Sequence, residues 1–280
     1  MVKAYEIYRT IKQQLQEAGI ENAGLDARLL LKKATGAGRF DDVDVSTKQQ
    51  EELQTLVQRR IAHEPLQYLV GSWPFLNLEL EVGPGVLVPR PETEEVCIAA
   101  MDCIKLLSNP AVVDLCSGTG ALALGIQDSN PNANVLAVEW DKAAYGYLCK
   151  NIQNFKKEHR QAPLPVLADA LEYYSRLTPQ SVDLVVSNPP YVTEQEYLEL
   201  EDELYYEPKQ ALVAPEDGLL FYKTIAKKYR EALKPGGFIV FEIGSGQGKD
   251  LHDLLQLNGY RNIEIKKDMN GNDRIASACL

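Results

Sequence analysis

One segment of the chain combines small and polar residues in a way that suits nucleoside binding. Residues 114–120 read Asp-Leu-Cys-Ser-Gly-Thr-Gly and lie between an apolar run and a helix-forming run. Glycine lets a backbone turn sharply and approach a ligand where a Cβ atom would clash. Glu139 ends the next apolar run, a position from which a carboxylate can bind ribose hydroxyls. The motif alone is equally typical of a tight turn or of a site for another nucleotide, since Ala123 replaces the third glycine of a dinucleotide-binding loop.

A second segment places an amide, two prolines and an aromatic ring together. Residues 187–191 read Ser-Asn-Pro-Pro-Tyr and follow the apolar run 181–186. Open α/β sheets bind ligands at the carboxyl ends of their strands, so we expect this segment and the glycine-containing loop at one edge. Prolines restrict their own backbone and that of the residue before them, which presets the local geometry. A structural role, with prolines ending a strand and Tyr191 packed on the core, would explain the prolines but not the amide.

The elements that must position these two segments alternate between strand and helix. Helices are predicted at 92–107, at 121–127 and from the second strand through residue 154. Apolar strands are predicted at 111–115, 134–138, 164–167, 181–186 and 238–241. Such strands separated by helices indicate a parallel sheet covered on both faces. Residues 263–267 and 274–278 flank Asn270-Gly271, a hairpin signal, so we expect the sheet to end in an antiparallel pair.

The first part of the chain has a helical pattern instead. Apolar residues recur at helical spacing, the first four being Tyr5, Tyr8, Ile11 and Leu15. Residues 25–31 form a second amphipathic segment, and Ser46 with Gln49 three residues later predicts the capped start of a third helix. These stripes predict a small helical bundle that packs on itself and that could also dock a partner protein.

A short region of strand character follows the bundle. Residues 76–82 alternate between apolar and polar, residues 83–85 read Gly-Pro-Gly, and residues 86–88 extend again, which predicts a β-hairpin. We therefore expect a helical domain at 1–70 that docks the substrate protein, a hairpin linker at 71–91 and a large α/β domain at 92–280.

Composition and charge exclude several classes of protein. The 280 residues include 29 basic and 40 acidic side chains, and a net charge of −11 disfavours general coating of nucleic acid. The 5 cysteines lack metal-ligand spacing, which argues against a zinc site or a disulfide framework and for a reducing compartment. The first residues lack the apolar segment of a signal peptide, and no apolar run reaches the ~20 residues that span a bilayer. We expect a cytoplasmic protein without a metal and without membrane contact.

Asn-Pro-Pro-Tyr after a Gly-x-Gly loop resembles the S-adenosylmethionine-dependent methyltransferases that act on planar nitrogens. Over essentially the whole chain the sequence is similar to the HemK-type glutamine methyltransferases, on segments 64–71, 88–94, 206–208, 211–212, 216–219 and 241–244. It departs from that family at Cys116, where glycine is usual, and at Leu87, where an aromatic residue is frequent. The resemblance implies a Rossmann-like methyltransferase domain. It also implies N5-methylation of the glutamine in the Gly-Gly-Gln motif of peptide chain release factors, with S-adenosylhomocysteine as the second product.

The resemblance implies roles for individual residues. The Asn188 side-chain oxygen and the Pro189 carbonyl would accept the two N–H groups of the substrate amide, Pro190 would restrict the backbone, and Tyr191 would offer a π face. Arg90 would border the substrate pocket, although a structural ion pair with Asp114 would explain both residues as well. The residues expected to contact the methyl donor are Asp114, Cys116, Ser117, Gly118, Thr119, Gly120, Glu139, Asp169, Ala170 and Asn188.

Other interpretations stay open at this point. Glutamine methylation of a ribosomal protein would use the same residues, and N6-adenine methylation of nucleic acid would need base flipping and a basic channel. A non-catalytic nucleotide-binding adaptor would have no use for Asn188. The acidic segment 194–207 is typical of a solvated helix face, or of a lid over the amide site. We expect a monomeric enzyme whose partner is a release factor.

Overall fold

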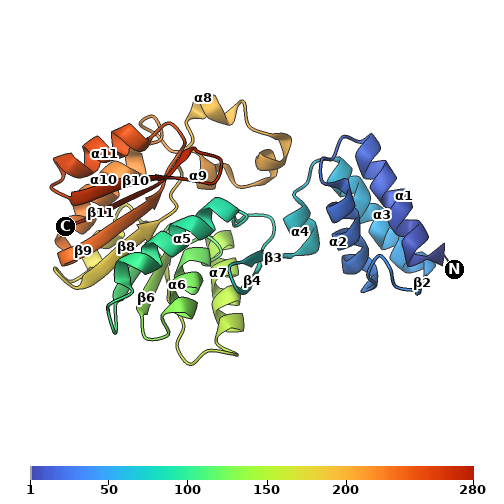
Figure 1. Cartoon of the computed structure of the whole chain (residues 1–280), viewed down its shortest axis with the longest axis horizontal. Coiled ribbons are helices and arrows are strands. Elements are labelled where there is room, and N and C mark those ends of the chain that lie inside the picture. Colours follow the sequence, from blue (N-terminus) through green and yellow to red (C-terminus); the bar gives the residue numbers. More distant parts are fainter. Residues whose placement is uncertain (1) are drawn as a thin grey trace. The chain divides into compact units, whose positions relative to one another are not determined.

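A seven-stranded sheet organises the larger of two units in the computed structural model, which describes residues 2–280 (Figure 1). This unit comprises Pro74–Leu200 and Glu207–Leu280. Its strands, in spatial order, are β10 (Arg261–Lys267), β11 (Asp273–Cys279), β9 (Leu233–Glu242), β8 (Val182–Ser187), β5 (Ala111–Leu115), β6 (Asn134–Glu139) and β7 (Leu164–Leu167). Strands β9 to β7 pair in parallel, and β11 and β10 pair antiparallel. The predicted mostly parallel sheet with an antiparallel end is confirmed.

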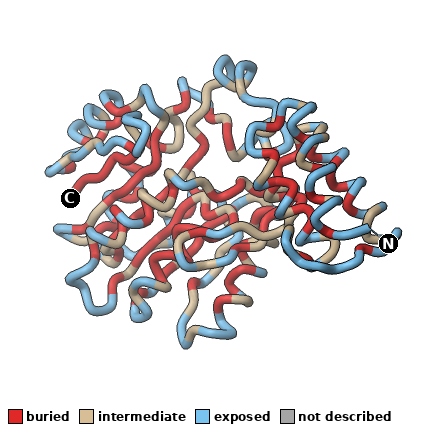
Figure 2. The backbone as a smooth tube through the Cα atoms, turned by 45° about the vertical axis from the view of Figure 1, so that its right-hand side comes forward, coloured by how far each residue is buried: buried red, intermediate tan, exposed pale blue. Residues whose placement is uncertain are grey.

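Helices cover both faces of the sheet. On one face lie α5 (Pro91–Ile104), α6 (Ala121–Ser129) and α7 (Lys142–Phe155), and on the other lie α10 (Leu220–Lys228), η3 (Tyr229–Glu231) and α11 (Gly248–Leu257) (Figure 1). Val112 and Leu184 pack into the first layer, and their neighbours Val113 and Val185 pack into the second. The central strands β5, β6 and β8 are therefore buried on both sides, whereas the edge strand β10 is mostly exposed. Figure 2 shows buried chain running through the middle of the larger unit. Short helices in the connections are η1 (Tyr173–Arg176), α8 (Glu194–Tyr197) and α9 (Lys209–Leu212).

The strand order reverses between β5 and β8, and this point positions the two sequence motifs. Leu115, the last residue of β5, pairs with Ser187, the last residue of β8, and the Ser187 hydroxyl donates to the Leu115 carbonyl at 2.7 Å. Connections from strands on either side of such a reversal run in opposite directions and leave a crevice between them. The glycine-containing loop and the Asn-Pro-Pro-Tyr segment therefore begin side by side at the carboxyl edge of the sheet.

The smaller unit, Met1–Trp73 with Glu201–Tyr206, is mainly helical. Its elements are β1 (Val2–Lys3), α1 (Ala4–Glu17), α2 (Ala23–Thr35), β2 (Asp44–Val45), α3 (Thr47–Ile61), α4 (Leu66–Val70) and η2 (Asp202–Tyr206). Ile11 and Leu15 are buried in its core as predicted, whereas Tyr5 is exposed. The predicted cap of α3 is present, because the Gln49 N–H donates to Ser46 Oγ and the Ser46 N–H donates to Gln49 Oε1.

The predicted hairpin between residues 76–82 and 86–88 is wrong. In the structure, β4 (Leu78–Glu81) pairs with β3 (Ser72–Phe75), the strand that precedes it in the chain, and not with residues 86–88. An alternating pattern marks a strand but does not say which neighbour it pairs with. Val86 and Val88 are instead buried within the larger unit, and the Val88 N–H donates to Glu207 Oε2 at 2.9 Å.

The other predicted elements differ mainly at their ends. Helix α5 stops at Ile104 rather than at 107, and β9 begins at Leu233, five residues before the predicted 238, because its pairing with β8 continues through an irregularity near Val182. Nowhere in residues 2–280 does a helix have the length and apolar character needed to cross a membrane.

Candidate functional site

A cavity opens at the carboxyl edge of the sheet, beside the ends of β5, β6 and β8. Its volume is about 770 Å³ when the open solvent at its mouth is included. Five stretches of the larger unit line it, together with Thr93 and Phe221. They fall within residues 85–89, 114–122, 139–144, 188–190 and 208–211. Both sequence motifs therefore reach one cavity.

The glycine-containing loop adopts a left-handed backbone at three positions. Cys116, Gly118 and Gly120 have φ values of 58°, 55° and 85°. A Cβ atom on Gly120 would lie 2.7 Å from the Leu148 side chain, which would have to shift, so both φ and this contact favour glycine there. Cys116 occupies a conformation that costs a residue with a side chain roughly 1–2 kcal/mol. Burial raises the pKa of its thiol, so Cys116 stays protonated.

The Glu139 carboxylate is held by backbone N–H groups from two segments. Oε2 accepts from Gly118 at 2.8 Å, and Oε1 accepts from Trp140 at 2.9 Å and Asp141 at 2.8 Å. Burial raises the pKa of Glu139, and these three donors act in the opposite direction by favouring the ionised form. The side chain lines the cavity in a fixed orientation with acceptor capacity left for hydroxyl groups.

Asp114 lines the same cavity and is fully buried. Its Oδ2 atom accepts from the Ala123 N–H at 3.2 Å, whereas Oδ1 has no hydrogen-bond partner. Burial raises the pKa of Asp114 to about 8. A buried carboxyl oxygen without a partner is costly, and a ligand carrying an amino group would satisfy it.

The Asn188 side chain reaches the cavity and is bonded on its nitrogen side. Its Nδ2 donates to Thr93 Oγ1 at 3.3 Å, and the Thr93 hydroxyl donates to Glu242 Oε2 at 2.6 Å. Thr93 lies in the first turn of α5, and Glu242 ends β9. Sequence reasoning did not single out Thr93 or Glu242, and the only signal was their place within two of the segments that resemble the family.

Tyr191 lies with its hydroxyl in the same network rather than in the cavity lining. It donates to Glu242 Oε1 at 3.4 Å and accepts from Arg274 Nη1 at 3.4 Å. Burial raises the pKa of Tyr191, so its hydroxyl stays neutral. Of the two prolines, Pro190 lines the cavity, and Pro189 is buried beside it.

Several predicted site residues lie away from the lining. Arg90 forms an ion pair with the buried carboxylate of Glu207, so the predicted alternative partner Asp114 is not its partner. Asp169 is exposed and its Oδ1 accepts from the Leu171 N–H at 2.8 Å, and the Ala170 carbonyl accepts from Tyr229 at 2.6 Å. Ser117 and Thr119 do line the cavity, and so do several residues that sequence reasoning missed, among them Trp140, Gln210 and Phe221.

The acidic segment 194–207 matches neither predicted form completely. It folds into α8, which is exposed, and η2, which belongs to the helical unit, and it ends in the buried Glu207. Across residues 2–280 no group of histidine, cysteine and acidic side chains is arranged to hold a metal ion.

Comparison with known proteins follows the same division of the chain. Residues 6–71 match the PrmC N-terminal domain, and residues 70–234 match the family described as Conserved hypothetical protein 95. A release factor glutamine methyltransferase from Bifidobacterium longum is 35% identical over 96% of this chain and 97% of that protein. Its counterpart from Escherichia coli strain K12 is 32% identical over 94% and 93%. The chain belongs to the release factor glutamine methyltransferase family.

The likeness of fold extends beyond this family. A methyltransferase from Pyrococcus furiosus shares the architecture of the larger unit with a TM-score of 0.50 and 16% identity, over 73% of this chain and 89% of that one. The larger unit thus has the fold of a known methyltransferase, and a helical region precedes it, as the sequence predicted.

Proposed function

We propose that this enzyme transfers a methyl group from S-adenosylmethionine to the side-chain amide nitrogen of the glutamine in the Gly-Gly-Gln motif of a peptide chain release factor. The observation that carries the proposal is that the Asn188 amide and the nucleoside-type loop at 114–120 open into one cavity at the reversal of strand order. The family, shown over nearly the whole chain, supports a release factor as substrate.

The cavity residues fit the methyl donor. Glu139 would accept from the ribose hydroxyls, and Gly118 would let the backbone approach the nucleoside. The unpartnered Oδ1 of Asp114 would meet the donor's amino group. Trp140, which follows Glu139 and is half exposed at the cavity, would flank the adenine ring. Asp169 and Ala170 follow β7, the strand paired with β6, and would need to approach the donor to contact its adenine ring.

The chemistry needs precise presentation of a weak nucleophile. An amide nitrogen is a poor nucleophile because its lone pair is delocalised into the carbonyl. S-adenosylmethionine supplies an electrophilic methyl group on a sulfonium, so the protein does not need to activate the donor with a metal. Asn188 Oδ1 and the Pro189 carbonyl would accept the two N–H groups, which orients the nitrogen and compensates the positive charge that develops on it.

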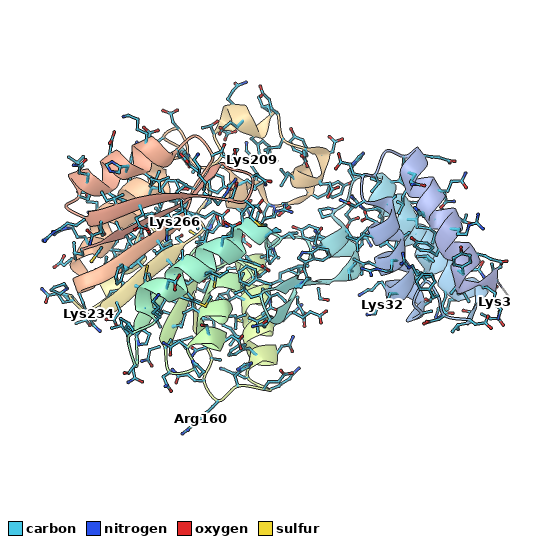
Figure 3. The ribbon with its side chains drawn as sticks, in the orientation of Figure 1. Lys3, Lys32, Arg160, Lys209, Lys234 and Lys266 are labelled. Carbon is cyan, nitrogen blue, oxygen red and sulfur yellow. The ribbon has the colours of Figure 1, made fainter. Side chains whose placement is uncertain are left out.

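A protein substrate suits the distribution of charge better than a nucleic acid. The basic residues labelled on the larger unit in Figure 3, Arg160, Lys209, Lys234 and Lys266, come from separate parts of its fold. Lys209 pairs with Glu194 at 2.7 Å, and Lys234 pairs with Asp183 at 2.7 Å. With a net charge of −11, the chain offers a basic partner protein a more favourable field than it offers a phosphate backbone.

The test is methyl transfer to defined acceptors. Purified enzyme with labelled donor is offered a release factor, a ribosomal protein and DNA in parallel, and mass spectrometry locates the added methyl group. We expect the release factor glutamine to be methylated. Asn188→Ala should lower the rate by about 100-fold or more while donor affinity by calorimetry stays within a few fold.

The matched control is Asn132→Ala, which removes an exposed asparagine amide just before β6, at the opposite end of that strand from Glu139 and the cavity. It should retain the wild-type rate. Methylation of DNA or of the ribosomal protein alone would contradict the proposed substrate. A wild-type rate in Asn188→Ala would contradict the role given to that amide.

A further inference from the structure

The transfer step places a demand on the orientation of the Asn188 amide. Its two branches have almost the same shape, but Oδ1 accepts hydrogen bonds and Nδ2 donates them. A substrate –NH2 group needs an acceptor. If the side chain turned by half a rotation, Nδ2 would face the substrate N–H groups and the complex would lose that hydrogen bond. Something other than shape must therefore hold Oδ1 toward the substrate.

The partner on the other branch is Thr93. Asn188 Nδ2 donates to Thr93 Oγ1 at 3.3 Å, and Thr93 Oγ1 in turn donates its proton to Glu242 Oε2 at 2.6 Å. Thr93 and Glu242 are both at least nine-tenths buried, with exposed fractions of 4% and 3%. Water therefore does not compete readily for the bond between Thr93 and Glu242.

Glu242 determines the direction in which protons are donated along this chain of hydrogen bonds. Burial raises the pKa of Glu242 to about 6, so at neutral pH the group is mainly a carboxylate, which only accepts. The single proton of the Thr93 hydroxyl is committed to that carboxylate. The Thr93 oxygen can then only accept from Asn188, which selects Nδ2 and turns Oδ1 away from α5.

Glu242 is itself fixed from three other elements. Its Oε1 accepts from the Tyr191 hydroxyl at 3.4 Å, and its backbone carbonyl accepts from Tyr222 of α10 at 2.8 Å. Arg274 of β11 donates to the Tyr191 hydroxyl at 3.4 Å and to the Ile243 carbonyl at 3.2 Å. The carboxylate therefore has little freedom to move away from Thr93.

We propose that Thr93 and Glu242 are positioning residues, which set the amide orientation of Asn188 so that its oxygen accepts from the substrate nitrogen. This inference rests on the proposed function, because it assumes that Asn188 binds a substrate –NH2 group. Neither residue needs to touch the reacting atoms, and their effect passes through Asn188.

The test compares Thr93→Val with Thr93→Ser. Valine keeps the shape of threonine and removes the hydroxyl, whereas serine keeps the hydroxyl and removes the methyl group. We expect Thr93→Val to lower kcat by about 10- to 100-fold, because the amide loses its fixed orientation, with donor affinity close to that of Thr93→Ser. Its Tm should fall below that of Thr93→Ser, because the buried Glu242 carboxylate loses a donor, so kcat is compared at a temperature where both variants are folded. Thr93→Ser should retain kcat within a few fold of the wild type.

Equal kcat values for Thr93→Val and the wild type would overturn the inference. So would equal losses in the valine and serine variants, since that result would point to packing rather than to the hydroxyl. If valine prevents folding, Thr93→Ala against Thr93→Ser gives the same comparison. A wild-type enzyme that leaves release factor glutamine unmodified would instead contradict the proposed function, so the two failures are distinguishable.

Discussion

Glu139 and Asp114 both place a carboxyl group at the cavity, but their hydrogen-bond donors differ. Glu139 has three backbone N–H donors, whereas Asp114 has one, and its second oxygen has no partner. Burial outweighs the hydrogen bonds that favour the charged form of Asp114 and raises its pKa to about 8 from an ordinary 3.8. In the absence of a cationic ligand Asp114 is protonated at neutral pH.

This pKa predicts how stability changes with pH. Between about pH 3.8 and pH 8 Asp114 holds a proton in the folded protein and not in the unfolded chain. Its contribution to the free energy of unfolding is therefore complete below about pH 3.8 and is lost as the pH rises through 8. Asp114→Asn removes this titration. From pH 6 to pH 8 we expect the wild-type free energy of unfolding to fall by about 2 kcal/mol more than that of the variant, by urea denaturation.

The comparison of unfolding free energies starts at pH 6 because the pKa of Glu242 is about 6. At that pH much of the contribution of Glu242 to the free energy of unfolding has already been lost. Asp250→Asn is the control, because Asp250 is exposed on α11 and should give the wild-type slope. Equal slopes in Asp114→Asn and the wild type would show that Asp114 is already ionised at pH 6.

At the scale of elements, the Asn-Pro-Pro-Tyr segment is held by a turn that comes more than twenty residues later. Gly218 has φ +77°, and a Cβ atom placed on it would lie 2.2 Å from the Tyr191 carbonyl oxygen. The same oxygen accepts from Gln247 Nε2 at 3.1 Å. The turn and the start of α11 therefore fix the backbone that follows Pro190.

Gly218→Ala should displace this backbone as well as strain the turn. The control is Gly236→Ala, where φ is +82° but nothing lies within 4 Å of the added Cβ atom. Both variants carry the cost of a left-handed alanine, roughly 1–2 kcal/mol. We expect Gly218→Ala to lose more stability than Gly236→Ala in thermal unfolding and to lose most of its methylation rate. Similar losses of both properties in the two variants would show that the turn does not support the motif.

At the scale of the whole molecule, the helical unit is not one continuous piece of chain. Residues Glu201–Tyr206 return to it from the segment that follows the Asn-Pro-Pro-Tyr motif. Arg60 is buried and donates to Asp26 at 2.7 Å, to Glu203 at 2.5 Å and to the Glu64 carbonyl at 3.2 Å. The chain therefore passes between the units three times, and a buried arginine holds the returning segment.

Removal of this arginine should release the segment. Arg60→Ala leaves the Asp26 carboxylate buried without its partner, which costs roughly 3–5 kcal/mol of stability. We expect the amides of residues 201–206 to exchange hydrogen much faster, measured by mass spectrometry. Lys3→Ala, which removes an exposed ion pair with Asp42 in the same unit, should change neither property. Unchanged exchange in Arg60→Ala would mean that other contacts hold the segment, such as the Tyr206 hydroxyl on the Ala62 carbonyl at 2.6 Å.

The sequence by itself determined the features that depend on nearby residues. Strand β5 was predicted at its observed bounds and β6 and β8 within one residue, because continuous apolar runs between helices are a local signal. The Ser46 cap and the strand-end places of Gly118, Glu139 and Asn188 follow from spacing alone. The family resemblance added the chemistry, which composition and periodicity do not contain.

The tertiary structure alone decided which distant residues share an environment. Thr93 and Glu242 are 149 positions apart, and Arg90 and Glu207 are 117 apart, so no sequence period connects them. The same holds for the pairing of β4 with the strand before it and for the left-handed backbone at Cys116. Burial and hydrogen-bond partners depend on how layers pack, and this packing sets the pKa of Asp114 and the orientation of the Asn188 amide.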